Sequence, residues 1–142
     1  MAQTTDELLN QLLSSDSIEQ FLELNGEKQL SFTLSEYLQT LLEEKHMKKA
    51  DVIRNSHFDI TYAYQLFDGK KSNPARDKLI QLAFGFGLDL NATQKLLHVA
   101  KAGVLYVKNR RDSIIIFALE NRLSLIEANA LLDKEKEKPL EL

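Results

Sequence analysis

The sequence predicts an all-α fold, and three observations lead to that prediction. Apolar residues recur at spacings of three and four along most of the 142-residue chain, which is the period of an amphipathic helix. Capping patterns of the type Ser/Thr/Asp-x-x-Glu precede four of these apolar runs. Neither a solenoid repeat nor a low-complexity linker interrupts the body of the chain. We therefore expect roughly seven to nine helices and no extended sheet.

The composition is typical of a globular protein that can bury a substantial core. Of the 142 residues, 44% are hydrophobic and 27% are charged, and the length fits one domain with at most a small appendage. The absence of cysteine excludes disulfides and cysteine-ligated zinc. No apolar run approaches the ~20 residues of a membrane span, and the acidic N-terminus is unlike a signal peptide. We expect a cytoplasmic protein without a membrane partner.

The first expected unit is an N-terminal helical hairpin over residues 1–32. Thr4 and Asp16 would each cap a short helix rich in apolar residues, and Asn25-Gly26 would end the second helix. Both helices have apolar faces that need a partner, which is either the rest of the domain or a second copy of the chain.

Residues 33–103 are expected to form the main helical domain, whose second and third helices are joined by a tight turn. Thr33 would cap the first helix. The second helix would end at Asn55-Ser56-His57, and Asp59 would cap the third. Gly69 would end that third helix in a left-handed conformation, which has no steric cost for glycine.

Two more helices would complete this domain. The first would span residues 74–86, with Asn73 as its cap and Gly85-Phe86-Gly87 as its stop signal. The second would be capped by Asn91 and closed by Gly103.

Residues 104–142 are expected to form a C-terminal helical extension with a charged tail. Residues 104–107 are a short apolar run that fits either a strand or a buried linker. A helix over residues 111–121 would be apolar over much of its surface, so we expect it to be deeply buried or part of an interface. Ser124 would cap a last helix, after which the charged tail is expected to fray.

The charges are distributed unevenly along the chain. Residues 1–44 contain nine acidic residues and one lysine, whereas residues 45–80 contain eight basic and four acidic residues. Residues 81–142 are close to balanced, with nine basic and eight acidic residues. The positive excess of this chain, whose net charge is −3, therefore falls on the second and third helices of the main domain.

We expect neither an enzymatic activity nor a cofactor. His46, His57 and His98 are scattered, and none is paired with another histidine or a carboxylate at a metal-binding spacing. Gly85-Phe86-Gly87 precedes no phosphate-binding helix with a Walker lysine, and no serine lies in a nucleophile-elbow motif. Solvated or hydrogen-bonded histidines are the simpler interpretation, so we predict no metal site.

Residues 47–69 resemble, without gaps, the helix-turn-helix of the phage-repressor (Cro-like, XRE) family. Val52 and Ile53 stand where that family has Leu-Ala, and Ala63 and Leu66 stand at the inward sites of its recognition helix. The glycine that ends the recognition helix is also matched. The resemblance implies a five-helix lambda-repressor-like domain, to which the helices at both ends of this chain are additions.

The sequence departs from this family in two respects. His57 stands where a turn glycine with a left-handed backbone is usual, and histidine tolerates that conformation better than most residues. Leu42 and Phe67 stand where an arginine and a glutamate are frequent. We expect an apolar contact between these two side chains, because packed apolar groups often replace a buried ion pair without loss of stability.

The resemblance implies that the recognition helix enters the major groove of double-stranded DNA. Gln65 would pair with adenine, Thr61 would meet a thymine methyl or a phosphate, and Tyr62 would bond a phosphate. The predicted DNA-binding residues are Lys48, Lys49, Asp59, Thr61, Tyr62, Gln65, Lys70 and Lys71, with Lys108, Arg110 and Arg111 as a secondary basic contact.

Two functions of different classes fit these observations. The first is a sequence-specific, DNA-binding transcriptional regulator of bacterial or phage type that acts as a homodimer. The alternative is an adaptor or antitoxin-like protein, in which the same helices bind another protein. The recognition helix has no arginine, and its outward Ile60, Tyr62 and Tyr64 also suit a protein interface, which supports the alternative. We expect the regulator first and keep the adaptor as the alternative.

Overall fold

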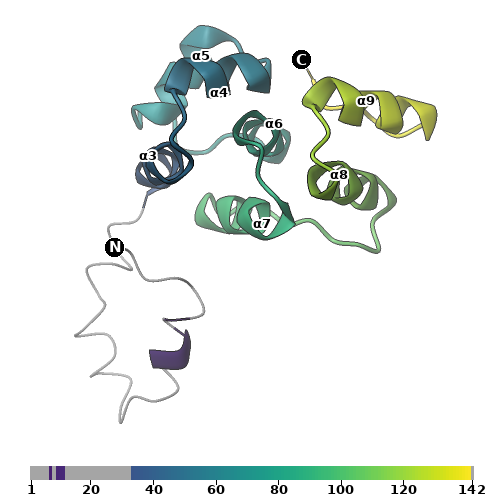
Figure 1. Ribbon diagram of the computed structural model, residues 1–142, viewed down its shortest axis with the longest axis horizontal. Coiled ribbons are helices and arrows are strands. Elements are labelled where there is room, and N and C mark those ends of the chain that lie inside the picture. Colours follow the sequence, from purple (N-terminus) through teal and green to yellow (C-terminus); the bar gives the residue numbers. More distant parts are fainter. Residues whose placement is uncertain (1–6, 8, 12–32, 142) are drawn as a thin grey trace. The chain divides into compact units, whose positions relative to one another are not determined.

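Helix α6 occupies the middle of a helical unit that begins at Thr33. The computed structural model describes residue 7, residues 9–11 and residues 33–141, and this part of the chain is all-helical, without a strand. Its helices are α3 (Leu34–Lys45), α4 (Lys49–Ser56), α5 (Ile60–Phe67), α6 (Arg76–Phe86), α7 (Leu90–Val99), α8 (Arg110–Glu120) and α9 (Leu125–Lys134). The chain divides into two units, Met1–Phe32 and Thr33–Leu142. Within the second unit, α6 contacts α3, α4, α7 and α9 (Figure 1).

Little of the N-terminal unit can be compared with the sequence prediction. Residue 7 and residues 9–11 are helical, and Leu9 is exposed. The expected caps Thr4 and Asp16 and the expected stop at Asn25-Gly26 lie outside the described residues.

Several predicted helix ends of the second unit are confirmed. The side chains of Thr33, Asp59 and Ser124 each accept a hydrogen bond from the backbone N–H three residues further on. His57 has a φ of 56° and a ψ of 38°, so the left-handed turn that we expected there is present. Gly69 has a φ of 86° and follows the end of α5. Local capping and turn chemistry therefore determine these positions.

Helix α6 begins later than predicted. Its N-cap is Ala75, which has an extended backbone and provides no side-chain cap. Pro74 lies before the helix, and Asn73 is not its cap, so both expectations were wrong. The side chains of Arg76 and Asp77 are held by ion pairs to α8, and these contacts place the two residues in the first turn of α6.

Both ends of α7 also differ from the prediction. The N-cap is Asp89, not Asn91, and its carboxylate accepts the backbone N–H of Ala92 at 2.9 Å. Glu120 of α8 accepts a further bond from the first N–H of α7, at 2.7 Å. The left-handed residue after the helix is Lys101, with a φ of 59°, so Gly103 does not close it.

Gly85 does not stop α6 as predicted; it allows α4 to approach that helix closely. It is buried within α6, and Gly87, with a φ of 68°, ends the helix. A Cβ atom on residue 85 would collide with Ser56 Oγ and would lie 2.7 Å from the carbonyl oxygen of Val52. Ser56 Oγ donates to that carbonyl at 2.7 Å, and the Gln81 amide donates to the carbonyl of Ser56 at 3.1 Å. Helix α4 is thus held against α6 by backbone proximity and a buried interhelical hydrogen bond.

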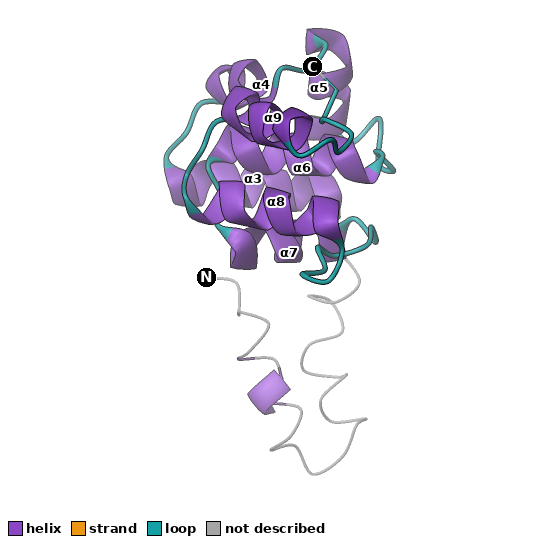
Figure 2. Ribbon diagram, turned by 90° about the vertical axis from the view of Figure 1, so that its right-hand side faces the viewer, coloured by secondary structure: helices purple, strands orange, loops and turns teal. Residues whose placement is uncertain are grey.

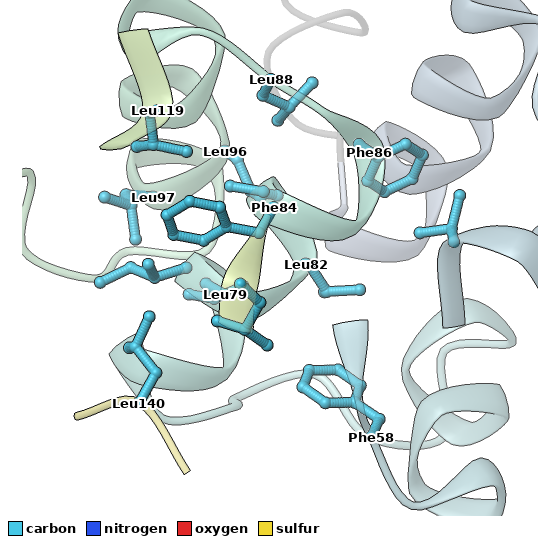
Figure 3. Packing of buried hydrophobic residues seen from close by; sticks show 14 of the residues in the cluster. Phe58, Leu79, Leu82, Phe84, Phe86, Leu88, Leu96, Leu97, Leu119 and Leu140 are labelled. Carbon is cyan, nitrogen blue, oxygen red and sulfur yellow. The ribbon is translucent and has the colours of Figure 1, made fainter. Parts of the chain in front are cut away.

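One hydrophobic cluster connects all seven helices of residues 33–141 with the connections between them and the C-terminal tail (Figure 3). Leu42 and Phe67 are both buried in this cluster, on helices α3 and α5 that pack against each other. The Phe67 ring lies 6.2 Å from that of Phe86, measured between ring centres. Both side chains are therefore buried, as the expected contact between them requires.

The C-terminal helices α8 and α9 belong to the same unit, in contact with α7 and α6 respectively (Figure 2). Of residues 104–107 only Leu105 is buried, and the Gln94 side chain holds its backbone N–H and carbonyl with two 2.8 Å hydrogen bonds. Leu140 is only 1% exposed, and the Asn129 side chain holds its backbone in the same way at 2.7 Å. The tail is therefore anchored at residue 140, and the expectation that it frays was wrong.

A reciprocal set of ion pairs, the α6–α8 clasp, joins the first turns of α6 and α8. Arg76 donates two hydrogen bonds to the Asp112 carboxylate, at 3.0 and 2.7 Å. Arg111 donates two to the Asp77 carboxylate, both at 3.0 Å. Arg76 also donates to two carbonyls of the α7–α8 connection, and Arg111 to a carbonyl of the tail. The clasp therefore fixes α8 and the tail to the start of α6.

The clasp shifts the pKa of Asp112. Burial by itself raises the pKa of this carboxyl group. Hydrogen bonds from Arg76 and from the backbone N–H of Tyr106, together with the charges of Arg76 and Arg111, outweigh burial, so the pKa lies below its usual value of 3.8. The stabilisation is therefore complete above that usual value and is lost as the pH falls through the lower pKa of the folded state.

We expect Asp112→Asn to lower the free energy of unfolding by roughly 1.5–3 kcal/mol near pH 7, the range for hydrogen bonds to a charged group. The difference from wild type should shrink as the pH falls below about 4. Urea unfolding at pH 7 and pH 3 measures both values. Asp51→Asn is the control, because its pair with Arg54 is exposed and should contribute less than about 1 kcal/mol. A difference that grows toward low pH would contradict the role of Asp112.

We expect Gly85→Ala to destabilise the fold by about 2 kcal/mol or more, because the Val52 carbonyl is backbone and cannot give way unless α4 moves. The matched control is Gly103→Ala. There the nearest atom to the added Cβ is Arg76 Nε at 3.9 Å, so stability should stay within about 0.5 kcal/mol of wild type. Thermal or urea unfolding tests the pair, and equal stability of both variants would disprove the close approach.

Candidate functional site

The exposed face of α5 is the centre of the candidate site. The opposite face of the helix is buried in the core, and its buried residues are Ala63, Leu66 and Phe67. On the outer face, Ile60 and Tyr64 are 64% and 43% exposed, although both are large hydrophobic residues. Thr61 is also exposed, and Tyr62 and Gln65 are half-buried. Helix α5 therefore presents a mixed apolar and polar strip on its outer face.

Asp59, one of the predicted DNA contacts, acts as the N-cap of α5. Its carboxylate accepts the backbone N–H of Tyr62 at 3.0 Å and lies at the positive end of the helix. The ring of Tyr62 packs edge-on against that of Phe58, with 6.1 Å between ring centres. Asp59 therefore positions the start of α5, and its negative charge makes it a poor direct contact for a phosphate.

Four of the predicted DNA-binding lysines flank α5. Lys48 is the N-cap of α4, and Lys49 is the first residue of that helix. The ammonium of Lys49 lies 5.8 Å from the ring centre of Tyr64, within the range of a cation–π interaction. Lys70 and Lys71 follow α5 and are exposed. The structure thus brings Lys49 to the C-terminal half of α5, the end of the helix that Lys70 and Lys71 follow.

The predicted secondary basic contact is divided by the structure. Arg110 pairs with Glu135 at 3.0 Å and approaches Glu137 at 3.9 Å. Arg111 belongs to the α6–α8 clasp. Lys108 is exposed and has no ion-pair partner among the residues that the structure describes. Both arginines are therefore neutralised by carboxylates of other elements, which their sequence spacing did not indicate.

Lys78 is a cation near the α4–α5 connection that the sequence did not single out. Its ammonium lies 5.4 Å from the ring centre of Phe58, which is buried within that connection. The two residues are far apart in the sequence and share no periodic pattern, so only the packing of α6 reveals their contact.

Comparisons with protein-family models, with curated proteins and with solved structures find no match to this chain. Among the described residues, no group of three or more histidine, aspartate or glutamate side chains could hold a metal ion. None of the helices in the described ranges is long and apolar enough to cross a membrane. The candidate site is therefore defined by the geometry and charge of α4, α5 and their flanking lysines.

The capping role of Asp59 can be tested with two substitutions at the same position. We expect Asp59→Ala to lower the free energy of unfolding by about 1 kcal/mol, because the first turn of α5 loses its acceptor. Asp59→Asn should lower the free energy of unfolding by less than half of this amount, since asparagine is also a good N-cap. Urea unfolding measures both. Equal losses for the two variants would show that the charge, and not the cap, is what stabilises α5.

Proposed function

We propose that this chain is a sequence-specific, DNA-binding transcriptional regulator of the phage-repressor (XRE) type, in which α3 to α7 form the lambda-repressor-like domain and α4 and α5 its helix-turn-helix. One observation supports this most strongly. An exposed helix follows a three-residue connection with a left-handed His57, and lysines lie at both ends of this helix pair. Cations beside an exposed helix suit the phosphate backbone that borders a major groove.

In this proposal α5 enters the major groove, and its side chains have two different tasks. Gln65 lies one turn beyond Thr61, so both residues share a strip of the helix. Gln65 would read a base edge, and Thr61 would meet a thymine methyl or a phosphate. Lys48, Lys49 and the lysines after Gly69 would bind phosphates and set the orientation of the helix without reading sequence.

The regulator would act as a homodimer that places two α5 helices in successive major grooves, about 34 Å apart. Helix α8 buries one face, yet its Phe117 is 56% exposed, and Ile126 on α9 is exposed to the same extent. A dimer built through α8 and α9, which contact each other, would cover these exposed apolar side chains. This supports a role of the C-terminal helices in dimerisation.

We expect Gln65→Ala to cost about 1–3 kcal/mol on the best DNA site and to relax the preference at one base pair. Lys70→Ala should weaken binding to all sequences about equally and reduce the salt slope by about one. The site would be selected from genomic fragments with the full-length chain, and binding would then be measured by titration at several salt concentrations. Lys134→Ala, which removes the same charge from α9, is the control and should leave affinity and slope unchanged.

The second candidate function is an adaptor that binds another protein through α5. The specific observation in its favour is the exposure of Ile60 and Tyr64 on a helix that carries no arginine. An adaptor would show neither a preferred DNA site in competitor DNA nor a steep salt slope. If no site is selected and Gln65→Ala abolishes a protein contact, the adaptor function replaces the regulator.

A further inference from the structure

A hollow of about 370 Å³ lies between the end of α4 and the turn that joins α8 to α9. Asn55 and His57 line it from α4, Gly87 from the end of α6, and Arg122 and Ser124 from the α8–α9 turn. This volume is within the roughly 300–1,000 Å³ of sites that bind small molecules. The hollow is separate from the exposed face of α5, because none of the outward residues of α5 lines it.

Apolar side chains form part of the lining of the hollow, beside its polar residues. Phe84, Leu88, Leu119 and Leu125 line it, and all four belong to the buried core, of which Figure 3 shows the first three. Leu123, which is half-buried, adds apolar surface beside them. Edges of core side chains that meet a hollow can bury an apolar group of modest size.

Arg122 supplies a positive charge that no carboxylate of the described residues neutralises. The other arginines each pair with a carboxylate, and they are Arg54, Arg76, Arg110 and Arg111. Arg122 is exposed and has no such partner among the described residues. It is also held at a φ of 55°, a left-handed conformation that non-glycine residues seldom adopt. A free guanidinium beside apolar side chains is suited to bidentate binding of a carboxylate.

Glu127 is the acidic residue that lines the same hollow, and its carboxylate caps the N-terminus of α9. Its carboxylate accepts the backbone N–H of Ser124 at 2.9 Å, and its own N–H donates to Ser124 Oγ at 3.1 Å. This capping box places the carboxylate at the positive end of α9. Glu127 therefore does not neutralise Arg122 by a direct ion pair.

We propose that this hollow binds a small organic carboxylate with an apolar body. The carboxylate would pair with Arg122, and the body would lie on Phe84, Leu88 and Leu123. Because Asn55 and His57 stand at the end of α4, an occupant would also touch the connection that orients α5.

The test is a titration of the full-length, ¹⁵N-labelled chain with 3-phenylpropionate, followed by amide chemical shifts. We expect saturable shifts at Gly87, Arg122 and Ser124. The neutral isostere 3-phenylpropionamide should bind at least tenfold more weakly, because it has the same shape without the charge. A second pair, hexanoate and hexanamide, tests whether the apolar body must be aromatic.

Arg122→Gln should weaken binding of the carboxylates at least tenfold. The matched control Arg54→Gln removes an exposed arginine of α4 that does not line the hollow, and it should bind like wild type. Because Arg122 has no ion pair to lose, Arg122→Gln should melt within about 2 °C of wild type, so that a loss of binding is not a loss of fold. Absence of saturable shifts with both carboxylates would overturn the proposal. Equal affinity for acid and amide, or for Arg122→Gln and wild type, would do so as well.

Discussion

The close approach of α4 to α6 at Gly85 is the constraint on which the position of the α4–α5 pair depends. The backbone of α4 lies so near to α6 that no side chain fits between Gly85, Ser56 and the Val52 carbonyl. Gln81 adds a buried hydrogen bond from α6 to the last residue of α4. Since α4 connects to α5 through only three residues, a fixed α4 also fixes where α5 begins. The position of the outer face of α5 is thus determined by packing in the core and not by the surface loops.

The α6–α8 clasp extends the same rigid unit to the C-terminal helices. Two arginines and two aspartates form it from the first turns of the two helices, and it also holds the α7–α8 connection and the tail. The side-chain amides of Gln94 and Asn129 form hydrogen bonds to the backbone of Leu105 and Leu140, respectively. These bonds hold the two leucines in the core. One consequence concerns which positive charges remain at the surface. The two arginines of the basic cluster, Arg110 and Arg111, are paired with carboxylates, whereas Lys48, Lys70 and Lys71 remain exposed.

The candidate site was predictable where local chemistry determines it. Helical spacing identified the outward residues of α5, and capping and turn preferences identified Asp59, His57 and Gly69. What each charged side chain does was less predictable. Lys49 packs over Tyr64, and Arg110 and Arg111 pair with carboxylates of other elements, because such roles depend on neighbours that only the folded chain supplies. The hollow beside Arg122 is formed by four separate helices or their ends, so no sequence pattern could indicate it.

By itself the sequence determined that the chain is helical, where most helices lie, and which residues cap several of them. These features depend on interactions between residues that are three or four positions apart in the sequence. The periodicity of apolar residues and the capping patterns indicate such interactions directly. Only the tertiary structure decided that Gly85 is a packing site and not a stop signal, that Asp89 caps α7, and that the tail is anchored. It also decided which arginines pair with carboxylates of distant elements. The physical reason is distance along the chain, because these contacts join residues that no local pattern relates.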